Sequence, residues 1–186
     1  METMEKSAIE TEETPKKTEG GDYGKPLTVC FVCTGNTCRS PMAAAILNDM
    51  ARIPQVCSMS DIEKLLNSRR IRAVSAGLYA DGSPISENAV RALENAGIRS
   101  LPDNDYKSHI STSVTPELME TCDRVIGISG GHAMRLISFF PQYASKITCL
   151  PHDIPDPFGG DLAAYETCLA AIRADVVQMF FPEREG

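Results

Sequence analysis

The sequence predicts an α/β fold, a three-layer sandwich in which a central four-stranded parallel sheet carries helices on both faces. Two observations carry this prediction. Short apolar runs rich in β-branched residues alternate along the chain with helical patterns, which is typical of a parallel sheet covered on both sides. The chain has 186 residues, 42% of them apolar, which is enough for one core and too short for two ordinary enzyme domains.

The first half of the pattern is strand, tight loop, helix, strand. The run 27–32 is apolar and β-branched, and the next segment, 40–52, is rich in helix-forming residues and stops before Pro54. A second strand is expected at 71–75, ended by Gly77. This order places a turn between the first strand and the first helix, which is the arrangement that an anion site needs.

The second half repeats the alternation. A helix is expected over 86–96, with Ser86 as its cap and Gly97 as its stop. The remaining predicted elements are a short helix at 115–120, a strand at 123–128, a helix from Gly130 through Phe140, a strand at 146–150, a loop rich in Pro, Gly and Asp at 151–160, and a closing helix at 161–180. Ligands of such sheets bind where the carboxyl ends of the strands open, so the loops after the first and fourth strands are expected to meet there.

Composition excludes several classes of protein. The net charge is −7, and the basic residues cluster only at Arg69, Arg70 and Arg72, which argues against a nucleic-acid partner. Residues 1–25 are acidic with little apolar content and are expected to form a disordered tail, leaving a single domain at 26–183. No signal peptide and no run of 18 apolar residues is present, so we expect a cytoplasmic protein without a membrane partner. The oligomeric state stays open.

The seven cysteines predict neither a zinc site nor a disulfide framework, because their number is odd and the one Cys-x-x-Cys spacing, from Cys30 to Cys33, has no second such pair to match it. Four of them lie in apolar segments and are expected to be inert buried thiols: Cys30, Cys122, Cys149 and Cys168.

The segment from Cys33 to Ser40 stands apart, because a thiol six residues before an arginine and closed by a hydroxyl can seat a phosphate. Backbone N–H groups of 34–39, the dipole of the following helix and the Arg39 guanidinium would all favour an anion, and the same groups would stabilise a Cys33 thiolate. Ser40 is placed to donate a hydrogen bond to that sulfur. The segment therefore predicts a cysteine nucleophile that attacks phosphorus.

Two residues of the segment serve its shape. Gly35 permits a backbone conformation closed to other residues, and the Asn36 side chain can brace a strained loop.

Such a reaction also needs a proton donor for the leaving group. Asp156 is the first candidate, because it lies on a proline-stiffened loop after the fourth strand, and Asp153 is the second. The three histidines, His109, His132 and His152, are candidates only by residue type.

Three motifs in order resemble the low-molecular-weight protein tyrosine phosphatase family: Cys33-Thr-Gly-Asn-Thr-Cys-Arg-Ser-Pro-Met, Ser75-Ala-Gly and Asp156-Pro-Phe-Gly-Gly. The likeness covers about residues 26–182. It implies a phosphorylated protein as substrate, a cysteinyl-phosphate intermediate on Cys33, Arg39 as the phosphate ligand and Asp156 as acid and then base, with no metal or other cofactor. The substrate-binding residues that it implies are Thr34, Gly35, Asn36, Thr37, Cys38, Ser40 and Phe158. It also implies a reversible disulfide between Cys33 and Cys38 under oxidation.

Thr37 departs from the tyrosine-specific pattern, which usually has a bulky aliphatic residue at this position, and resembles the bacterial protein-arginine phosphatase branch. A threonine hydroxyl can form hydrogen bonds, and its smaller size widens the floor of the pocket. Phe158 is then expected to be a wall that stacks on the flat substrate group. We therefore expect phosphoarginine as the substrate.

Three alternatives remain open: a phosphotyrosine phosphatase, an arsenate reductase, and a non-catalytic redox or anion-binding module. Against the reductase, 127–132 contains no cysteine to relay electrons. The segment between Pro41 and Ser75 is also longer than the family pattern, which predicts a helical insertion at 53–67.

Overall fold

A computed structural model describes residues 26–52 and 71–181. The expected acidic tail at 1–25 and the expected helical insertion at 53–67 lie outside the described residues. The elements are, in order, β1 (Leu27–Cys33), α1 (Arg39–Arg52), β2 (Ile71–Gly77), α3 (Glu87–Asn95), α4 (Pro116–Thr121), β3 (Arg124–Gly127), α5 (Gly130–Phe139), the 3₁₀ helix η1 (Pro141–Lys146), β4 (Ile147–Cys149) and α6 (Leu162–Phe180). Within the described ranges, no helix combines the length and the apolarity needed to cross a bilayer.

The four strands form one sheet in the order β2-β1-β3-β4, and every pairing is parallel. The expected four-stranded parallel sheet is thus confirmed. The chain leaves β1 toward β2 on one side and returns to place β3 on the other, so the strand order reverses beside β1. Ligands of open α/β sheets bind outside the carboxyl ends of the strands at such a reversal. Cys33 is the last residue of β1 and lies at this point.

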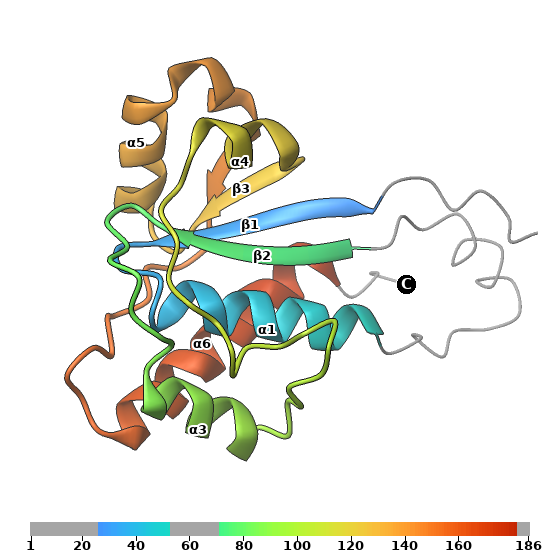
Figure 1. Ribbon diagram of the computed structural model, residues 1–186, viewed down its shortest axis with the longest axis vertical. Helices are drawn as coiled ribbons and strands as arrows, with labels where there is room; N and C mark the ends of the chain where they lie inside the picture. The colour runs from blue at the N-terminus through green and yellow to red at the C-terminus, as the bar shows by residue number, and fades with distance from the viewer. Residues whose placement is uncertain (1–25, 53–70, 182–186) are drawn as a thin grey trace, which may run out of the picture.

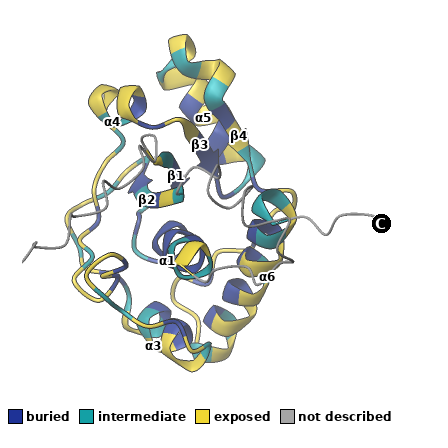
Figure 2. Cartoon of the chain, turned by 90° about the vertical axis from the view of Figure 1, so that its right-hand side faces the viewer, coloured by how far each residue is buried: buried dark blue, intermediate teal, exposed yellow. Residues whose placement is uncertain are grey.

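Helices cover both faces of the sheet, which gives the three layers that the sequence predicted (Figure 1). On one face α1 lies against the sheet, and α3 and α6 pack on α1. On the other face lie α4 and α5. Each face has its own apolar cluster, one containing Phe31, Ile46 and Ile172, the other Val32 and Leu136. Among the described helices α1 is the most enclosed, with its residues 39–47 all buried (Figure 2).

The helix boundaries follow from capping side chains. Ser86 accepts a hydrogen bond from Ala89 N–H at the start of α3, and Gly97 with a φ of 77° follows its end. Asp161 caps α6 by accepting from Ala164 N–H. These caps lie within one or two residues of the boundaries that the sequence predicts.

Two expectations differ from the structure in detail. The strand expected at 71–75 runs on to Gly77, because it stays paired with β1 as far as Cys33. Cys149 is partly exposed and not buried like the other three thiols expected to be inert. It lies in β4, an edge strand of three residues that is covered on fewer sides.

Candidate active site

The thiol of Cys33 lies at the floor of a loop that joins β1 to α1, here called the Cys33 loop (33–40). Its Sγ is 3.0 Å from Ser40 Oγ and accepts a hydrogen bond from the backbone N–H of Asn36 at 3.3 Å. Hydrogen bonds to sulfur favour its charged form. Two groups of the loop therefore contact the Cys33 sulfur, and one of them is the Ser40 hydroxyl, which also lies 3.2 Å from the carbonyl oxygen of Ala76.

Asn36 holds the loop in shape. It is fully buried and has a φ of 57°, and within the described residues no other non-glycine residue has a positive φ. Its Nδ2 donates to Ser40 Oγ and to Ser75 Oγ, both at 2.9 Å, and its Oδ1 accepts from Thr112 N–H at 2.9 Å. Because all three contacts come from its amide, this side chain offsets the cost of a left-handed backbone.

A histidine and a glycine close the back of the loop. His109 Nε2 lies 2.9 Å from the carbonyl oxygen of Asn36, and burial lowers the pKa of His109. A Cβ on Gly77 would lie 2.9 Å from Thr34 O and 3.0 Å from Asn36 Cβ. In the Ser75-Ala-Gly motif, Ser75 therefore accepts a hydrogen bond from the Asn36 side chain, and Gly77 leaves room for the backbone of the Cys33 loop to pack closely against it.

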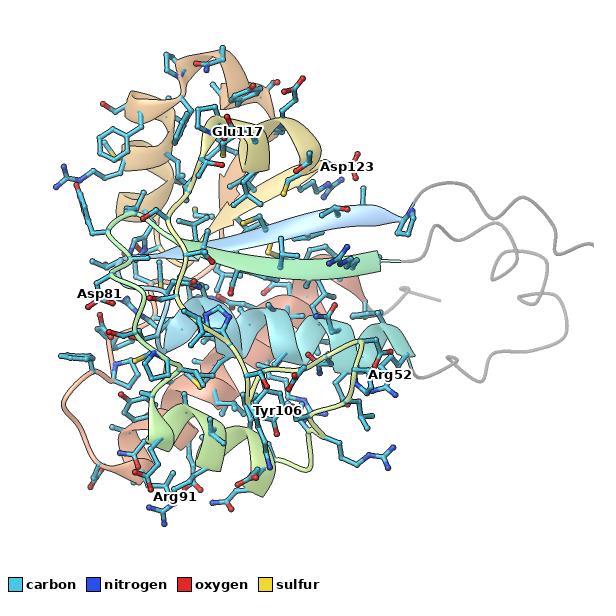
Figure 3. The ribbon with its side chains drawn as sticks, in the orientation of Figure 1. Arg52, Asp81, Arg91, Tyr106, Glu117 and Asp123 are labelled. Atoms are coloured by element: carbon cyan, nitrogen blue, oxygen red, sulfur yellow. The ribbon has the colours of Figure 1, made fainter. Side chains whose placement is uncertain are left out.

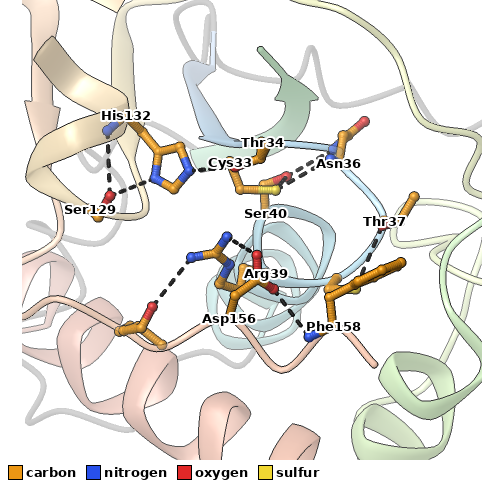
Figure 4. Close-up of polar contacts among 12 residues, drawn as sticks. Cys33, Thr34, Asn36, Thr37, Arg39, Ser40, Ser129, His132, Asp156 and Phe158 are labelled. Atoms are coloured by element: carbon orange, nitrogen blue, oxygen red, sulfur yellow. Dashed lines mark hydrogen bonds and ion pairs between the residues drawn. The ribbon is translucent and has the colours of Figure 1, made fainter. Parts of the chain in front are cut away.

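A second histidine supports the front of the loop. His132 Nε2 lies 3.1 Å from Thr34 Oγ1, and its Nδ1 lies 2.7 Å from Ser129 Oγ, the cap of α5 (Figure 4). Burial, and then the nearby charge of Arg39, lower the pKa of His132. A neutral imidazole with one donor and one acceptor nitrogen satisfies both hydroxyls.

Arg39 begins α1 and brings the Cys33 loop into contact with residues far along the chain. Its guanidinium forms an ion pair with Asp156 and donates to the carbonyl oxygen of Ile154 at 3.3 Å (Figure 4). The Arg39 side chain is 9% exposed, and its Nε has no hydrogen-bond partner. A buried donor without a partner is costly unless a ligand satisfies it. This guanidinium can therefore take up an anion.

A cavity of about 680 Å³ opens over the thiol. Its lining residues are Cys33, Thr34, Gly35, Thr37, Cys38, Arg39, Tyr79, Asp81, Ser83, Pro84, Ile85, Ser86, Glu87, Asp156 and Phe158. Figure 3 shows Asp81 on the loop after β2, at the edge where the strands end. Phe158 is 75% exposed and lines the cavity, so it stands at the mouth and not in the core.

The structure brings most of the predicted site residues to this cavity. Asn36 and Ser40 lie behind it, where they hold the loop and the sulfur. Of the two carboxylates that the sequence offered as acids, Asp156 lines the cavity, and Asp153 instead accepts from Gly130 N–H at 3.3 Å. None of the three histidines lines it.

Sequence reasoning did not assign the residues that support the site from outside the motifs. Tyr165 on α6 places its hydroxyl 3.3 Å from Cys38 Sγ, and Ser86 Oγ lies 3.6 Å from the same sulfur. Thr112 supports Asn36, as described above. No local pattern identifies these residues as part of the site, because each supports it through a contact with a residue more than 45 positions away in the sequence.

Comparisons of the sequence with known proteins find phosphatases, which agrees with a site built to bind an anion. The family model described as low molecular weight phosphotyrosine protein phosphatase matches residues 28–184. A protein-arginine-phosphatase of Bacillus subtilis (strain 168) is 33% identical over 147 residues, which are 75% of this chain and 85% of that protein. One of Geobacillus stearothermophilus is 32% identical over 148 residues, 75% and 84% of the two chains.

Solved structures show the same likeness. The YwlE arginine phosphatase from Geobacillus stearothermophilus superposes with a TM-score of 0.67 at 29% identity, covering 83% of this chain and 90% of that one. A low molecular weight protein tyrosine phosphatase from T. tengcongensis gives 0.66 at 31% identity, covering 82% and 97%. The chain belongs to the low-molecular-weight phosphotyrosine protein phosphatase family, and it is a hydrolase of the cysteine-dependent protein phosphatase class.

Proposed function

We propose that this enzyme hydrolyses phosphoarginine in proteins through a cysteinyl-phosphate intermediate. The observation that carries the substrate assignment is Thr37, which lines the cavity next to the thiol. Among the residues that the structure describes, its Oγ1 makes one hydrogen-bond contact, with Cys38 Sγ at 3.6 Å, which is weak. The hydroxyl is thus available to a substrate N–H or to the attacking water.

The reaction proceeds in two displacements at phosphorus. The Cys33 thiolate forms an S–P bond as the P–N bond breaks, and Asp156 gives its proton to the departing nitrogen. Water then attacks the cysteinyl-phosphate, Asp156 takes the proton from that water, and the S–P bond breaks to return the thiolate. Arg39 and the loop N–H groups hold the phosphoryl oxygens throughout, which stabilises the charge of both transition states.

The rim of the cavity supports a guanidinium substrate. Phosphoarginine presents N–H donors just beyond the phosphoryl group, whereas phosphotyrosine presents a hydrocarbon ring there. Besides the acid Asp156, the cavity lining offers two carboxylates as acceptors, Asp81 and Glu87. Hydrogen bonds from the Ser83 side chain and backbone lower the pKa of Asp81, which keeps it ionised at neutral pH. An acceptor-rich rim suits the donor-rich substrate.

Phosphotyrosine is the second candidate, favoured by the aromatic residues at the mouth. Tyr79 and Phe158 are both exposed and both line the cavity, and either can pack on a phenyl ring. They can also stack on a planar guanidinium, so they do not distinguish the two substrates. Thr37 does bear on the choice, because its hydroxyl can accept a hydrogen bond from the N–H groups of phosphoarginine, and phosphotyrosine has no such donor.

The other two alternatives receive less support. A reductase relay needs a reactive thiol beyond the loop, and burial raises the pKa of Cys168 to about 12, which keeps it protonated. A module that only binds anions has no use for Asp156 in the cavity.

The deciding experiment compares kcat/KM for a phosphoarginine protein and a phosphotyrosine peptide in the parent, Thr37→Ile and Thr37→Ser. We expect the parent to prefer phosphoarginine, Thr37→Ile to lose that preference, and Thr37→Ser to keep most of it because the hydroxyl remains. A parent that prefers phosphotyrosine, or a ratio that Thr37→Ile leaves unchanged, would contradict the arginine assignment.

We also propose that Cys33 and Cys38 form a reversible disulfide. A peroxide would oxidise the Cys33 thiolate to a sulfenic acid, and the Cys38 thiol would then attack that sulfur, its proton leaving with the sulfenic hydroxyl as water as the disulfide forms. Both thiols line the same cavity and are free in this structure. Peroxide should inactivate the parent and dithiothreitol should restore it, whereas Cys38→Ser should recover less. Equal recovery of both would contradict the disulfide.

A further inference from the structure

A buried carboxylate lies beneath the loop that carries Asp156, here called the Asp156 loop (150–161). Asp175, on α6, is 1% exposed. Its two oxygens bind one residue of that loop: Oδ2 accepts from the backbone N–H of His152 at 3.1 Å, and Oδ1 lies 2.7 Å from Nδ1 of the same residue. Burying a carboxylate is costly unless it is paired and hydrogen-bonded, so this pair needs a reason.

We look for that reason in Asp156, which follows His152 by four residues in the chain. His152 lies near the start of the Asp156 loop, and its side chain is 74% exposed, so the imidazole adds little to the core. The contact instead holds the chain that leads to the acid. A second contact follows at once, because the Asp153 carboxylate accepts from the N–H of Gly130 at the start of α5. The beginning of the loop is therefore attached to two helices on opposite faces of the sheet.

Two residues of the loop also bind Arg39, which donates to the Ile154 carbonyl oxygen and pairs with the Asp156 carboxylate. These two contacts with Arg39 differ in one respect from the contacts that His152 and Asp153 make with α6 and α5. Under the proposed function Arg39 holds the phosphoryl oxygens, so phosphate competes with Asp156 for the guanidinium. When substrate is bound, the position of Asp156 depends more heavily on the contacts that phosphate does not touch.

We propose that Asp175 is a positioning residue for the proton transfer: through His152 it holds Asp156 within reach of the leaving group while Arg39 is engaged by phosphate. This inference rests on the proposed function, in which Asp156 is the acid. Asp175 itself lines neither the cavity nor the thiol loop, so it acts only through the loop that it anchors. A misplaced acid should slow the departure of groups that need a proton and spare groups that do not.

The experiment measures kcat/KM for phenyl phosphate, a poor leaving group, and p-nitrophenyl phosphate, a good one. Asp175→Asn should lower the rate with phenyl phosphate by about 10-fold, the cost of a small misplacement, and change the rate with p-nitrophenyl phosphate by less than about 2-fold. In an Asp156→Ala background, Asp175→Asn should have no further effect, because no acid is left to position. Competitive inhibition by inorganic phosphate should stay unchanged, because Arg39 and the Cys33 loop are intact.

Two further variants separate positioning from stability. His152→Ala removes the exposed ring but keeps the backbone contact, so it should show the same leaving-group pattern with a smaller loss, and it serves if Asp175→Asn does not fold. Glu166→Gln is the matched control, an exposed carboxylate on the same helix that binds Asn95 at 2.7 Å; it should leave both rates unchanged.

Each adverse result has a distinct meaning. If Asp156→Ala itself shows no dependence on the leaving group, the acid role in the proposed function fails. Suppose instead that the loss in Asp156→Ala does depend on the leaving group. The positioning role is then wrong, and the proposed function stands, if Asp175→Asn and His152→Ala slow both substrates equally. The same conclusion follows if they slow the Asp156→Ala enzyme as much as they slow the parent.

Discussion

The Cys33 loop and the Asp156 loop face one cavity but are held in different ways. Asn36 and Ser40 of the first loop are fully buried, and their side chains make hydrogen bonds to residues of β2 and of the segment before α4. In the second loop Phe158 is mostly exposed, and the side chain of Asp156 is 47% exposed. The first loop is mostly buried, whereas the second lies largely at the surface and reaches the core through Leu150 and Ile154.

The difference matches what each loop has to do. Binding an anion requires N–H groups that already point at one place, since reorganising them during the reaction would cost the stabilisation that they provide. Donating a proton requires a carboxyl that can leave Arg39 when phosphate arrives. The Cys33 loop is therefore the more enclosed of the two, and the Asp156 loop is held by Asp175 and Gly130 near its beginning and by Arg39 and the buried Ile154 further along.

The largest effect should come from Cys33 itself. Cys33→Ser should abolish turnover of every phosphoester, by a factor on the order of 10⁴ or more, because the serine hydroxyl is a weak nucleophile without a base beside it. Steady-state kinetics with p-nitrophenyl phosphate measures this. Appreciable activity in the variant would contradict the cysteinyl-phosphate mechanism.

The next largest effect on the rate should come from Asp156, on the Asp156 loop. Asp156→Ala should lower kcat/KM by roughly 10² to 10⁴ for poor leaving groups such as phenyl phosphate, the usual worth of a positioned acid. The loss should shrink for p-nitrophenyl phosphate and for phosphoarginine, whose P–N bond is acid-labile. Equal losses across leaving groups would mean that Asp156 does not transfer the proton.

A smaller effect tests the rigidity of the first loop. In Gly77→Ala the new Cβ would meet a backbone oxygen of Thr34 that cannot move aside, which should cost about 1–3 kcal/mol and weaken inhibition by inorganic phosphate. Urea denaturation and inhibition constants measure the two changes. Gly130→Ala is the control, because a Cβ there meets nothing within 4 Å. If both variants behave alike, the close approach at Gly77 is not what shapes the loop.

The smallest effect concerns pH. Burial lowers the pKa values of His109 and His132, which support the Cys33 loop, below the ordinary value of 6.5. The unfolded chain then binds protons more readily than the folded one, so stability is greatest above pH 6.5 and falls as the pH drops through 6.5 toward the folded values. His132→Gln should therefore show a shallower decline of Tm between about pH 7 and pH 5. A slope equal to that of the parent would rule out this contribution from His132.

Much of this architecture could be predicted from local patterns. The alternation of strands and helices, the caps at Ser86 and Asp161, and the turn after β1 depend on residues close together in the sequence. The choice of Asp156 over Asp153 also agrees with the cavity. The partial exposure of Cys149 could not be predicted from local patterns. An apolar run indicates a strand, but it does not indicate whether that strand lies at the centre or at the edge of the sheet.

The sequence by itself determined the element order, the reaction class through Cys33 and Arg39, and the substrate hypothesis through Thr37, because each depends on residue chemistry within a few positions. Only the tertiary structure decided which distant groups complete the site. Ser75, His109 and Thr112 hold Asn36, Arg39 meets Asp156, and Asp175 anchors His152. These contacts join residues from 23 to 117 positions apart. Packing of whole helices and strands creates such contacts, and no local pattern records them.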